Sequence, residues 1–336
     1  MSDAKLTLPA AWGPHKRTWM AWPCRAELWG TQINSARGAY AAVAQAISRF
    51  EPVVMAARPE DAADASRLCG PSVEIWPVAL DDSWARDIAP HFLSDGTHAV
   101  DWRFNAWGSK FEVYTDDAAF GARLCERLGI ARIEAPMVLE GGSICGDGAG
   151  TLMTTEECLL HPNRNPSLTR SQIEDELKVR LGMDQILWFG QGLLDDETDG
   201  HVDNIACFAP GGRVLLAMPT GRGDPNWSRM QDNLSRLRAA RDMAGAPYEI
   251  IEVPLPAVRL TAEGRRMTRS YINFHVANGG LVLPAFDDPR DDEAAKLVAD
   301  AFPGRTVARV DANPILFGGG GIHCITYEEP AVRASV

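Results

Sequence analysis

One cysteine in the chain lies where covalent chemistry is conceivable. Cys324 belongs to the stretch FGGGGIHCIT (317–326), behind four glycines and directly after His323. A thiol close to a group that handles protons can act as a nucleophile. Most free cysteines are instead small, buried and inert, so this stretch alone leaves both interpretations open. If it forms a strand, His323 points away from Cys324, and we do not expect His323 to be the catalytic base.

Four further ionisable residues each stand just before a predicted β-hairpin. Taken singly, an Asp beside an Arg or a His-x-Asp pair at a strand end is as often structural as functional. If the hairpins repeat around one axis, however, these residues meet at one end of it, as the parts of a catalytic site must. On a strand, His201 and Asp203 would share a face. The four residues are Asp87 in WARD, Glu140 in LEGGSI, and His201 and Asp203 in GHVDN.

The combination of a thiol with several carboxylates narrows the chemistry. Negative charge raises the pKa of a thiol and repels the oxyanion of an acyl-transfer reaction. The same carboxylates suit a planar cation that presents several N–H groups, and guanidinium is such a cation. Its positive charge also favours the thiolate once it is bound. The residue set therefore predicts attack of Cys324 on a guanidinium carbon, with a cationic small molecule as the binding partner.

The elements that must position these residues recur along the chain. Each predicted hairpin consists of two apolar runs around a turn rich in Gly with Asp, Asn or Pro, which supplies the backbone angles of a tight turn. Amphipathic helical patterns lie between the hairpins, and a short β-like run follows each helix. The hairpins are predicted at 88–104, 143–154, 205–218 and 270–286, and the helices at 35–50, 116–130, 169–182, 224–245 and 288–302.

This repetition predicts an α/β fold of about five similar units of a strand hairpin plus a helix. We expect a five-unit pseudo-symmetric α/β propeller that forms a single domain over 1–336, with the fifth unit built from the two ends, 18–23 and 321–326. Closure around an axis removes exposed sheet edges. A doubly wound α/β fold is the alternative, but tight hairpins disfavour a purely parallel sheet.

Composition excludes several classes of partner. The net charge of −12 over 336 residues disfavours binding to nucleic acid or to an anionic membrane. No apolar run is long enough for a membrane span, and the N-terminus lacks a secretory pattern. Seven scattered cysteines argue for the cytoplasm rather than a disulfide framework. No zinc-type ligand spacing or phosphate-binding P-loop occurs, so we expect neither a metal nor a cofactor.

Long ordered motifs give the chain a resemblance to the agmatine deiminases. These belong to the guanidino-group-modifying superfamily, with the arginine deiminases, peptidyl-arginine deiminases and amidinotransferases. The resemblance spans nearly the whole chain. It is carried by PAAWGPHKRTWMAWPCRAELW (9–29), DDSWARDIAP (81–90), FNAWG (104–108), LEGGSI (139–144), ECLLHPNRNPS (157–167), DETDGHVDN (196–204), SYINFHVANGG (270–280) and GIHCIT (321–326).

The resemblance implies a fold, an activity and a set of roles. The implied fold is the five-unit α/β propeller, and the implied reaction is hydrolysis of agmatine to N-carbamoylputrescine and ammonia through a cysteine-bound amidino-thioether, without cofactor or metal. The implied roles are Cys324 as nucleophile, His201 as general acid and then base, Asp87 and Asp203 as guanidinium clamps, Glu140 beside His201 and the substrate, and Trp84 as a pocket wall.

Two positions depart from the family pattern. Gly321 stands where the family usually has Asn, three residues before Cys324, and Cys145-Gly146 stands where it usually has His-Val. Both bear on the substrate, and we count Gly321 among the substrate-binding positions. Asp196 and Glu197 are candidates for the distal ammonium of the substrate.

Three alternatives remain at this point. The first is a deiminase or hydrolase of another guanidine, such as peptidyl arginine; a free α-carboxylate would require an arginine partner, and Arg17, Arg86 and Arg103 lie near the motifs. The second is a non-catalytic binder of guanidines or polyamines, which would not need the thiol. The third is a metal hydrolase that uses His201, Asp203 and Cys324. The sequence leaves the assembly open, with a homodimer as the candidate.

Overall fold

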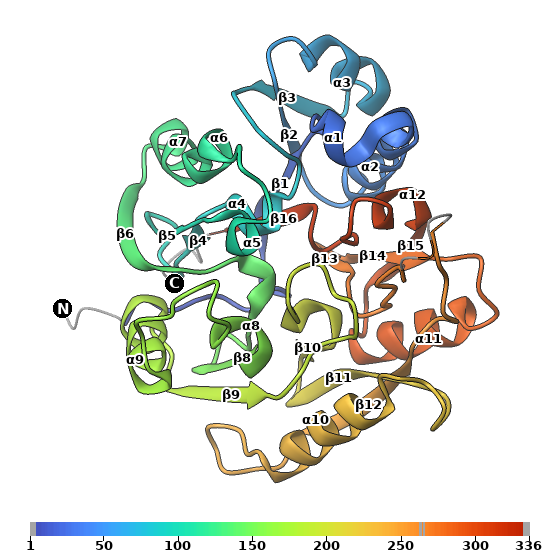
Figure 1. The fold of residues 1–336 in the computed structure, drawn as a ribbon. Helices are drawn as coiled ribbons and strands as arrows, with labels where there is room; N and C mark the ends of the chain where they lie inside the picture. Colours follow the sequence, from blue (N-terminus) through green and yellow to red (C-terminus); the bar gives the residue numbers. More distant parts are fainter. Residues whose placement is uncertain (1–4, 262–263, 265, 332–336) are drawn as a thin grey trace.

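The strands of the protein form five separate sheets, which follow one another around the centre of the molecule (Figure 1). The computed structural model describes residues 5–261, 264 and 266–331. The sheets are β16(Thr326–Pro330)–β1(His15–Ala21)–β2(Val53–Ala57)–β3(Val73–Pro77), β4(His91–Phe92)–β5(His98–Arg103)–β6(Ala131–Val138), β7(Ile144–Gly146)–β8(Thr151–Thr155)–β9(Gln185–Phe189), β10(Ala206–Ala209)–β11(Arg213–Met218)–β12(Glu249–Pro254) and β13(His275–Ala277)–β14(Gly280–Ala285)–β15(Thr306–Asp311).

One pairing pattern recurs in all five sheets. In the order given above for each sheet, the first strand pairs antiparallel with the second, and the second pairs parallel with the third. Four of the antiparallel pairs are the predicted hairpins, which are therefore confirmed. Their turns need glycine: Gly148 and Gly279 have φ of 70° and 72°, a region that side chains with a Cβ rarely adopt.

Helices connect the parallel strands, because two parallel neighbours cannot be joined by a tight turn. The five predicted helices are present, and Thr169 and Gln172 form a capping box at the start of α9. Asp224-Pro225 and Asp288-Pro289 precede α10 and α11, which begin two residues after the proline. The connecting helices are α2(Ile33–Ile47), α3(Ala62–Cys69), α6(Thr115–Ala118), α7(Phe120–Leu128), α9(Arg170–Leu181), α10(Trp227–Ala239) and α11(Asp291–Ala301).

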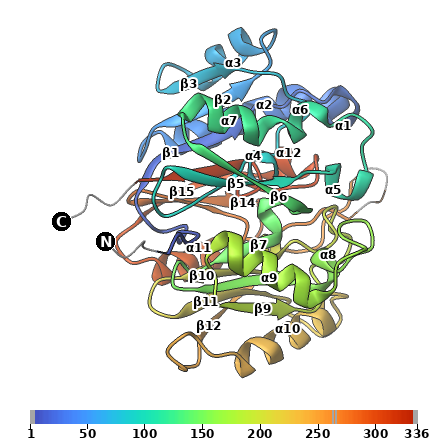
Figure 2. The same cartoon turned by 90° about the vertical axis from the view of Figure 1, so that its left-hand side faces the viewer.

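Short helical turns complete the units. The single turns are α1(Ala26–Trp29), α4(Ala85–Ile88), α5(Ala106–Ser109), α8(Glu156–Leu159) and α12(Asn313–Leu316), and the 3₁₀ turns are η1(Gly30–Gln32), η2(Gly141–Ser143) and η3(Val202–Asn204). In the side view, α3 and α10 lie at opposite outer edges with the strands between them (Figure 2). No helix in the described part of the chain is long and apolar enough to cross a membrane.

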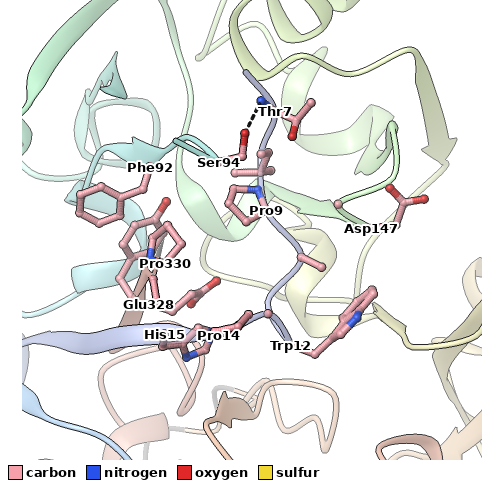
Figure 3. A pocket seen from close by; sticks show the side chains of 16 residues that line it. Thr7, Pro9, Trp12, Pro14, His15, Phe92, Ser94, Asp147, Glu328 and Pro330 are labelled. Carbon is pink, nitrogen blue, oxygen red and sulfur yellow. Dashed lines mark hydrogen bonds between the residues drawn. The ribbon is translucent and has the colours of Figure 1, made fainter. Parts of the chain in front are cut away.

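The two ends of the chain build one sheet together, as predicted. β16 pairs antiparallel with β1, and Trp19 lies opposite Tyr327. The segment that precedes β1 runs past the β7–β8 turn. Its residues, among them Trp12, line a cavity of about 510 Å³ together with Phe92 and Asp147 from other segments (Figure 3).

Two local predictions were wrong. Within 201–205 the chain forms the 3₁₀ turn η3 at 202–204 rather than a strand, and residues 322–325 form a turn, with β16 beginning only at Thr326. In the second place the Asn273 side-chain oxygen accepts from the backbone N–H groups of His323 and Cys324, which competes with strand pairing. At η3 the turn is closed by backbone bonds, from Asn204 N to His201 O and from Ile205 N to Val202 O.

Candidate active site

The predicted polar residues converge on one glycine. A Cβ atom placed on Gly142 in η2 would lie 2.6 Å from His201 Nδ1, 2.9 Å from Asp203 Oδ2 and 3.1 Å from Asp87 Oδ1. Asp87 lies in α4, whereas His201 and Asp203 lie together at η3, and all three side chains are buried. The predicted convergence is therefore confirmed as geometry, although η3 rather than a strand brings His201 and Asp203 together.

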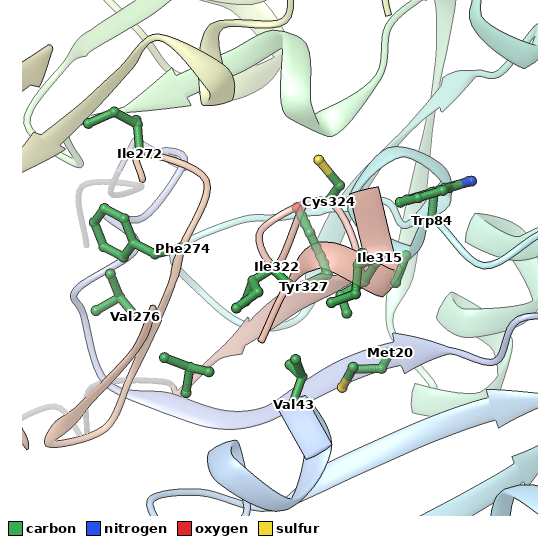
Figure 4. Close-up of a cluster of buried hydrophobic side chains, with 14 of the residues drawn as sticks. Met20, Val43, Trp84, Ile272, Phe274, Val276, Ile315, Ile322, Cys324 and Tyr327 are labelled. Carbon is green, nitrogen blue, oxygen red and sulfur yellow. The ribbon is translucent and has the colours of Figure 1, made fainter. Parts of the chain in front are cut away.

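Cys324 lies at the floor of a cavity of about 300 Å³. The residue is only 4% exposed, and its sulfur points away from the apolar side chains of Met20 and Val43 (Figure 4). The cavity is lined by Asp87, by the aromatic rings of Trp84, Trp107 and Phe111, and by the backbone of Gly318, Gly319 and Gly320. Cys324 is thus a buried thiol with one open side.

Trp84 forms a wall of this cavity, where it was predicted. Its ring stacks on Trp29, with 5.8 Å between ring centroids and 23° between planes. Glycine is required opposite the ring, because a Cβ on Gly320 would lie 2.4 Å from Trp84 Cζ3.

His201 is completely buried between two carboxylates. Its Nδ1 lies 3.9 Å from Asp87 Oδ1, and its Nε2 lies 3.6 Å from Glu140 Oε2. Burial alone would lower the pKa of His201, but the charge of Asp87, followed by Cys158 and Glu140, raises that pKa well above its usual value. Within the described residues neither ring nitrogen has a hydrogen-bond partner.

Asp87 is held by two donors. Its Oδ1 accepts from Gly142 N at 2.9 Å, and its Oδ2 accepts from Trp107 Nε1 at 2.9 Å. Trp107 has a φ of 54°, an uncommon value for an aromatic residue, and such strain is concentrated at functional sites. Burial raises the pKa of Asp87, and the charges of Asp203 and Glu140 add to the rise, against the lowering effect of His201.

Glu140 forms a fully buried ion pair. Arg164 Nε donates to Glu140 Oε1 at 2.7 Å, and neither side chain is exposed. Burial would raise the pKa of Glu140, but Arg164 and then His201 lower it below its usual value. Glu140 is therefore held as a carboxylate behind His201.

Asp203 is paired with His323, which corrects an expectation. His323 Nδ1 lies 2.8 Å from Asp203 Oδ2, whereas His323 was expected to point away from the site as a strand neighbour of Cys324. Because residues 322–325 turn, both side chains can reach Asp203. Burial would raise the pKa of Asp203, but His323, followed by His201 and Arg86, lowers it.

The thiol of Cys324 is subject to opposing influences. Burial raises its pKa well above the usual value, and the charges of Asp203 and Asp87 raise it further; the Gly321 backbone N–H and the Asn273 amide act in the opposite direction. The Sγ lies 3.7 Å from Asp203 Oδ2. A cation bound between these groups would lower the pKa of the thiol.

The remaining predicted positions divide into those inside and outside the cavity. Glu197 lines the cavity, whereas Asp196 does not: its oxygens accept from Thr198 and from Asn204 Nδ2. Gly321 packs against Asn273, not along the cavity.

The other departure from the family pattern also lies outside the cavity. Cys145 lines a separate cavity of about 30 Å³ together with Arg86 and Cys207. Gly146 faces Leu8 of the N-terminal segment instead, since a Cβ there would lie 2.9 Å from Leu8 Cδ2. Neither residue of the Cys145-Gly146 pair lines the cavity of Cys324.

The three arginines near the motifs do not reach the cavity. Arg86 donates to Glu328, Arg17 pairs with Glu329, and Arg103 is exposed on β5. No arginine in the described part of the chain lines the cavity of Cys324; its lining cation is Lys110.

Two groups of buried side chains have the spacing of metal ligands. One is Glu140, Cys158 and His201, which does not include Cys324 as the metal-hydrolase alternative required. The other is His15, Glu51 and His275, where both oxygens of Glu51 already accept hydrogen bonds, from Thr18 and from Asn278 N among others. Hydrogen bonding therefore accounts for the second group without an ion.

Sequence reasoning missed several residues of the site. Arg164, Trp107 and Asn273 all lie within motifs that were quoted above, in ECLLHPNRNPS, FNAWG and SYINFHVANGG. The available signals were an arginine between two Asn residues and a tryptophan before a glycine. Neither says which carboxylate the side chain binds, because that depends on contacts between units distant in sequence.

Comparisons with known proteins agree with this geometry. A family model described as Porphyromonas-type peptidyl-arginine deiminase matches residues 7–330. The chain is 42% identical over 354 residues to the agmatine deiminase of Stutzerimonas stutzeri (strain A1501), covering 96% of this chain and 95% of that protein.

Two solved structures extend the comparison. The structure of the Enterococcus faecalis agmatine deiminase superimposes with a TM-score of 0.91 at 30% identity and covers 97% of this chain and 96% of that one. A cysteine-to-serine variant of the C. jejuni agmatine deiminase with substrate bound gives a TM-score of 0.89 at 27% identity, with 98% and 97% covered. The predicted α/β class is confirmed by this likeness.

Proposed function

The chain belongs to the Porphyromonas-type peptidyl-arginine deiminase family, and from this premise we propose that it hydrolyses agmatine to N-carbamoylputrescine and ammonia. One observation carries the proposal: the Cys324 thiol and the Asp87 carboxylate face one cavity of about 300 Å³, with Asp203 3.7 Å from the sulfur and His201 behind Asp87. A thiol surrounded by carboxylates suits a cationic electrophile, and guanidinium is the planar cation that carboxylates bind in a bidentate manner.

The proposed reaction begins with the guanidinium held between Asp87 and Asp203. The bound cation offsets the charges that raise the pKa of Cys324, and the thiolate attacks the guanidinium carbon. His201, whose pKa is raised, donates a proton to the departing nitrogen, which leaves as ammonia. The product of this step is an amidino-thioether on Cys324.

Hydrolysis of that intermediate returns the enzyme to its starting state. His201, now neutral, takes a proton from water, whose oxygen adds to the same carbon. The carbon–sulfur bond breaks, and N-carbamoylputrescine leaves with the Cys324 thiol restored. Glu140 stabilises the imidazolium form of His201 throughout, because Arg164 keeps it ionised.

The lining of the cavity favours agmatine over free arginine. A substrate with a free α-carboxylate needs a cationic partner, preferably arginine, and the lining cation is Lys110, which already donates to Asp199 at 2.9 Å. The aromatic rings suit a plain alkyl chain. Glu197 lines the cavity and is the acidic group that we assign to the distal ammonium.

The repeated sheet pattern supports a matching proposal for the architecture. We infer that the five sheets are the units of a pseudo-symmetric α/β propeller and that residues 1–336 form one domain. The antiparallel–parallel pattern common to all five sheets and the pairing of β16 with β1 support it.

A substrate panel tests the function. Purified protein is incubated separately with agmatine, arginine, a blocked peptidyl arginine and guanidinobutyrate, and ammonia and urea are quantified. We expect ammonia from agmatine with the highest kcat/KM, and N-carbamoylputrescine by mass spectrometry. Preferred turnover of the peptidyl arginine would replace the substrate assignment with the second candidate, which the family description names.

The nucleophile is tested separately by Cys324→Ser. We expect turnover to fall to background while agmatine still binds, as measured by calorimetry, because the carboxylates remain. Cys69→Ala is the matched control, since Cys69 is buried in α3 away from the cavity. Undiminished turnover by Cys324→Ser would overturn the mechanism.

A further inference from the structure

The side-chain amide of Asn273 contacts the sulfur of Cys324. The residue precedes β13 and is 2% exposed. Its Nδ2 lies 3.1 Å from Cys324 Sγ. Its Oδ1 accepts from the backbone N–H of His323 at 2.8 Å and from that of Cys324 at 3.4 Å.

These contacts fix the orientation of the Asn273 amide. A backbone N–H can only donate, so the side of the amide that faces His323 N must be the oxygen. The NH₂ group therefore faces Cys324 Sγ and Asn204 Oδ1, the latter at 3.0 Å. Rotating the amide by 180° would place its NH₂ group against the backbone N–H groups of His323 and Cys324, so that donors would face donors.

A second amide gives this arrangement a direction. Asn204 Nδ2 donates to Asp196 Oδ2 at 3.1 Å, and an ionised carboxylate can only accept. The oxygen of Asn204 is thus turned toward Asn273. The chain of donors and acceptors runs from Asp196 through Asn204 to Asn273. The second N–H of Asn273 then faces the sulfur at 3.1 Å, with the Asp203 carbonyl a more distant acceptor at 3.5 Å.

We propose that the Asn273 amide is the side-chain hydrogen-bond donor that, beside the Gly321 backbone N–H, stabilises the Cys324 thiolate against the neighbouring carboxylates. This inference rests on the proposed role of Cys324 as nucleophile. A hydrogen bond to a charged acceptor is stronger than one to a neutral acceptor, so the contact favours the thiolate over the thiol. Asp87 and Asp203, which must stay close to hold the cation, act in the opposite sense.

Gly321 is the structural condition for this contact. A Cβ at position 321 would lie 2.4 Å from Asn273 Oδ1 and 2.9 Å from its Cγ. Any side chain there forces the amide to move, and the amide is what reaches the sulfur. The departure at Gly321 therefore acts on the nucleophile through Asn273 and not on the lining of the cavity.

The experiment measures the reactivity of the thiol without any substrate. The rate of iodoacetamide alkylation of the Cys324 peptide is followed by mass spectrometry from pH 7 upward until the rate levels off, in the parent protein, Asn273→Ala, Gly321→Ala and the double variant. We expect Asn273→Ala to move the midpoint up by about one pH unit, which makes alkylation about tenfold slower below the midpoint. Gly321→Ala moves it in the same direction.

Two results of this experiment distinguish a hydrogen-bond donor to the sulfur from a residue that only stabilises the turn at 322–325. Loss of the donor shifts the midpoint, whereas a displaced but chemically unchanged thiol alters the limiting rate at high pH and leaves the midpoint in place. If Gly321→Ala acts through Asn273, it adds nothing to the midpoint shift in the double variant. Asn233→Ala is the control, because Asn233 is buried and bonds only backbone groups and Met230 far from Cys324.

The outcomes are distinct from those of the substrate panel. An unchanged midpoint in both Asn273→Ala and Gly321→Ala, in folded protein as judged by circular dichroism, overturns the proposal even if agmatine is turned over. If Asn273→Ala does not fold, Gly321→Ala alone decides, since it keeps the amide and only displaces it. If the protein does not hydrolyse agmatine but the variants show the expected midpoint shift, the proposed substrate is wrong and the role of Asn273 as thiolate donor is supported.

Discussion

Arg164 and Glu140 form an ion pair that is closed off from solvent, with 2.7 Å between Nε and Oε1. Arg164 also donates to the Thr198 carbonyl and to Asp199 Oδ2, and Lys110 binds the other oxygen of Asp199. A single guanidinium thus links the carboxylate behind His201 to the wall of the Cys324 cavity. The pair is positioned to affect both stability and turnover.

Replacing Arg164 by Met should leave the buried Glu140 without its hydrogen-bonded partner, with His201 at 3.6 Å as the remaining cation beside it. Removal of one partner of a buried ion pair costs about 3–5 kcal/mol of unfolding free energy, measurable by urea denaturation at pH 7. We also expect kcat for agmatine to fall, because the pKa of Glu140 rises when Arg164 is lost and Glu140 then no longer supports protonated His201.

An exposed pair supplies the comparison. Arg309 Nη1 lies 2.5 Å from Asp292 Oδ1, with side chains 44% and 89% exposed. Arg309→Met should cost less than about 1 kcal/mol, as is usual for solvent-exposed pairs, and leave turnover unchanged. Equal losses in the two variants would contradict the importance of burial at Arg164.

Gly142 gives a prediction about space rather than charge. A Cβ there would lie 2.6 Å from His201 Nδ1 and 2.9 Å from Asp203 Oδ2, so Gly142→Ala must displace both. We expect kcat/KM to fall by about 10²-fold or more, since displacements of this size at a reacting centre are that costly. Ammonia release is the measurement.

Gly38→Ala is the control for Gly142→Ala. Gly38 lies within α2, and a Cβ there meets nothing within 4 Å. We expect stability to rise by about 0.5–1 kcal/mol, because alanine is the better helix former, and turnover to stay unchanged. A comparable loss of turnover in the two variants would mean that the crowding at Gly142 is not the cause.

The units of the fold were predictable because their signals are local. Hairpin turns such as Asn278-Gly279 and the capping box of Thr169 depend on neighbours within a few residues. The direction of His323 was not predictable. It depends on whether 322–325 continues a strand, and Asn273, about 50 residues upstream, binds two backbone N–H groups of that stretch and makes it turn.

The members of the site were predictable as residue types but not as pairs. Asp87, Glu140, His201, Asp203 and Cys324 were identified from their chemistry and their places before hairpins. Their partners come from other segments: the side-chain donor to Asp87 is Trp107, twenty residues away. A tryptophan in sequence predicts an apolar contact first, and only the assembled units show where its N–H goes.

Trp107 should set the acidic limit of turnover through Asp87. Its Nε1 donates to Asp87 Oδ2 at 2.9 Å and thereby lowers a pKa that burial has raised. Trp107→Phe removes this donor, so the pKa of Asp87 rises further and the carboxylate is protonated at higher pH. We expect the acidic limb of kcat/KM to move up by about one pH unit.

Trp102→Phe is the matched aromatic variant. Trp102 is also buried, but its Nε1 has no hydrogen-bond partner among the described residues. The same change of ring therefore removes no bond to a carboxylate. The acidic limb should stay where it is in Trp102→Phe, and a shift of the same size in both variants would contradict the role of the Trp107 N–H.

Glu328 should make the stability of the protein depend on acid. Arg86 Nη2 donates to Glu328 Oε2 at 2.6 Å; burial would raise the pKa of this carboxyl, but the charge of Arg86 lowers it from 4.5 to about 2. Between these values the unfolded chain binds the proton and the folded chain does not. The contribution of the pair to stability is thus present above pH 4.5 and lost as pH falls toward 2.

Glu328→Gln tests this dependence through the change of the unfolding free energy with pH, and not through its absolute value. The variant is destabilised at every pH, because Arg86 loses its partner, but it has no carboxyl at this position to titrate. Urea unfolding at intervals from pH 2.5 to 6 should therefore show a shallower fall of stability on acidification than in the parent protein. Glu60→Gln, which removes an exposed carboxylate, should retain the parent slope. A parent-like slope in Glu328→Gln would mean that other carboxylates cause the acid sensitivity, since only a group that titrates differently in the two states can contribute to it.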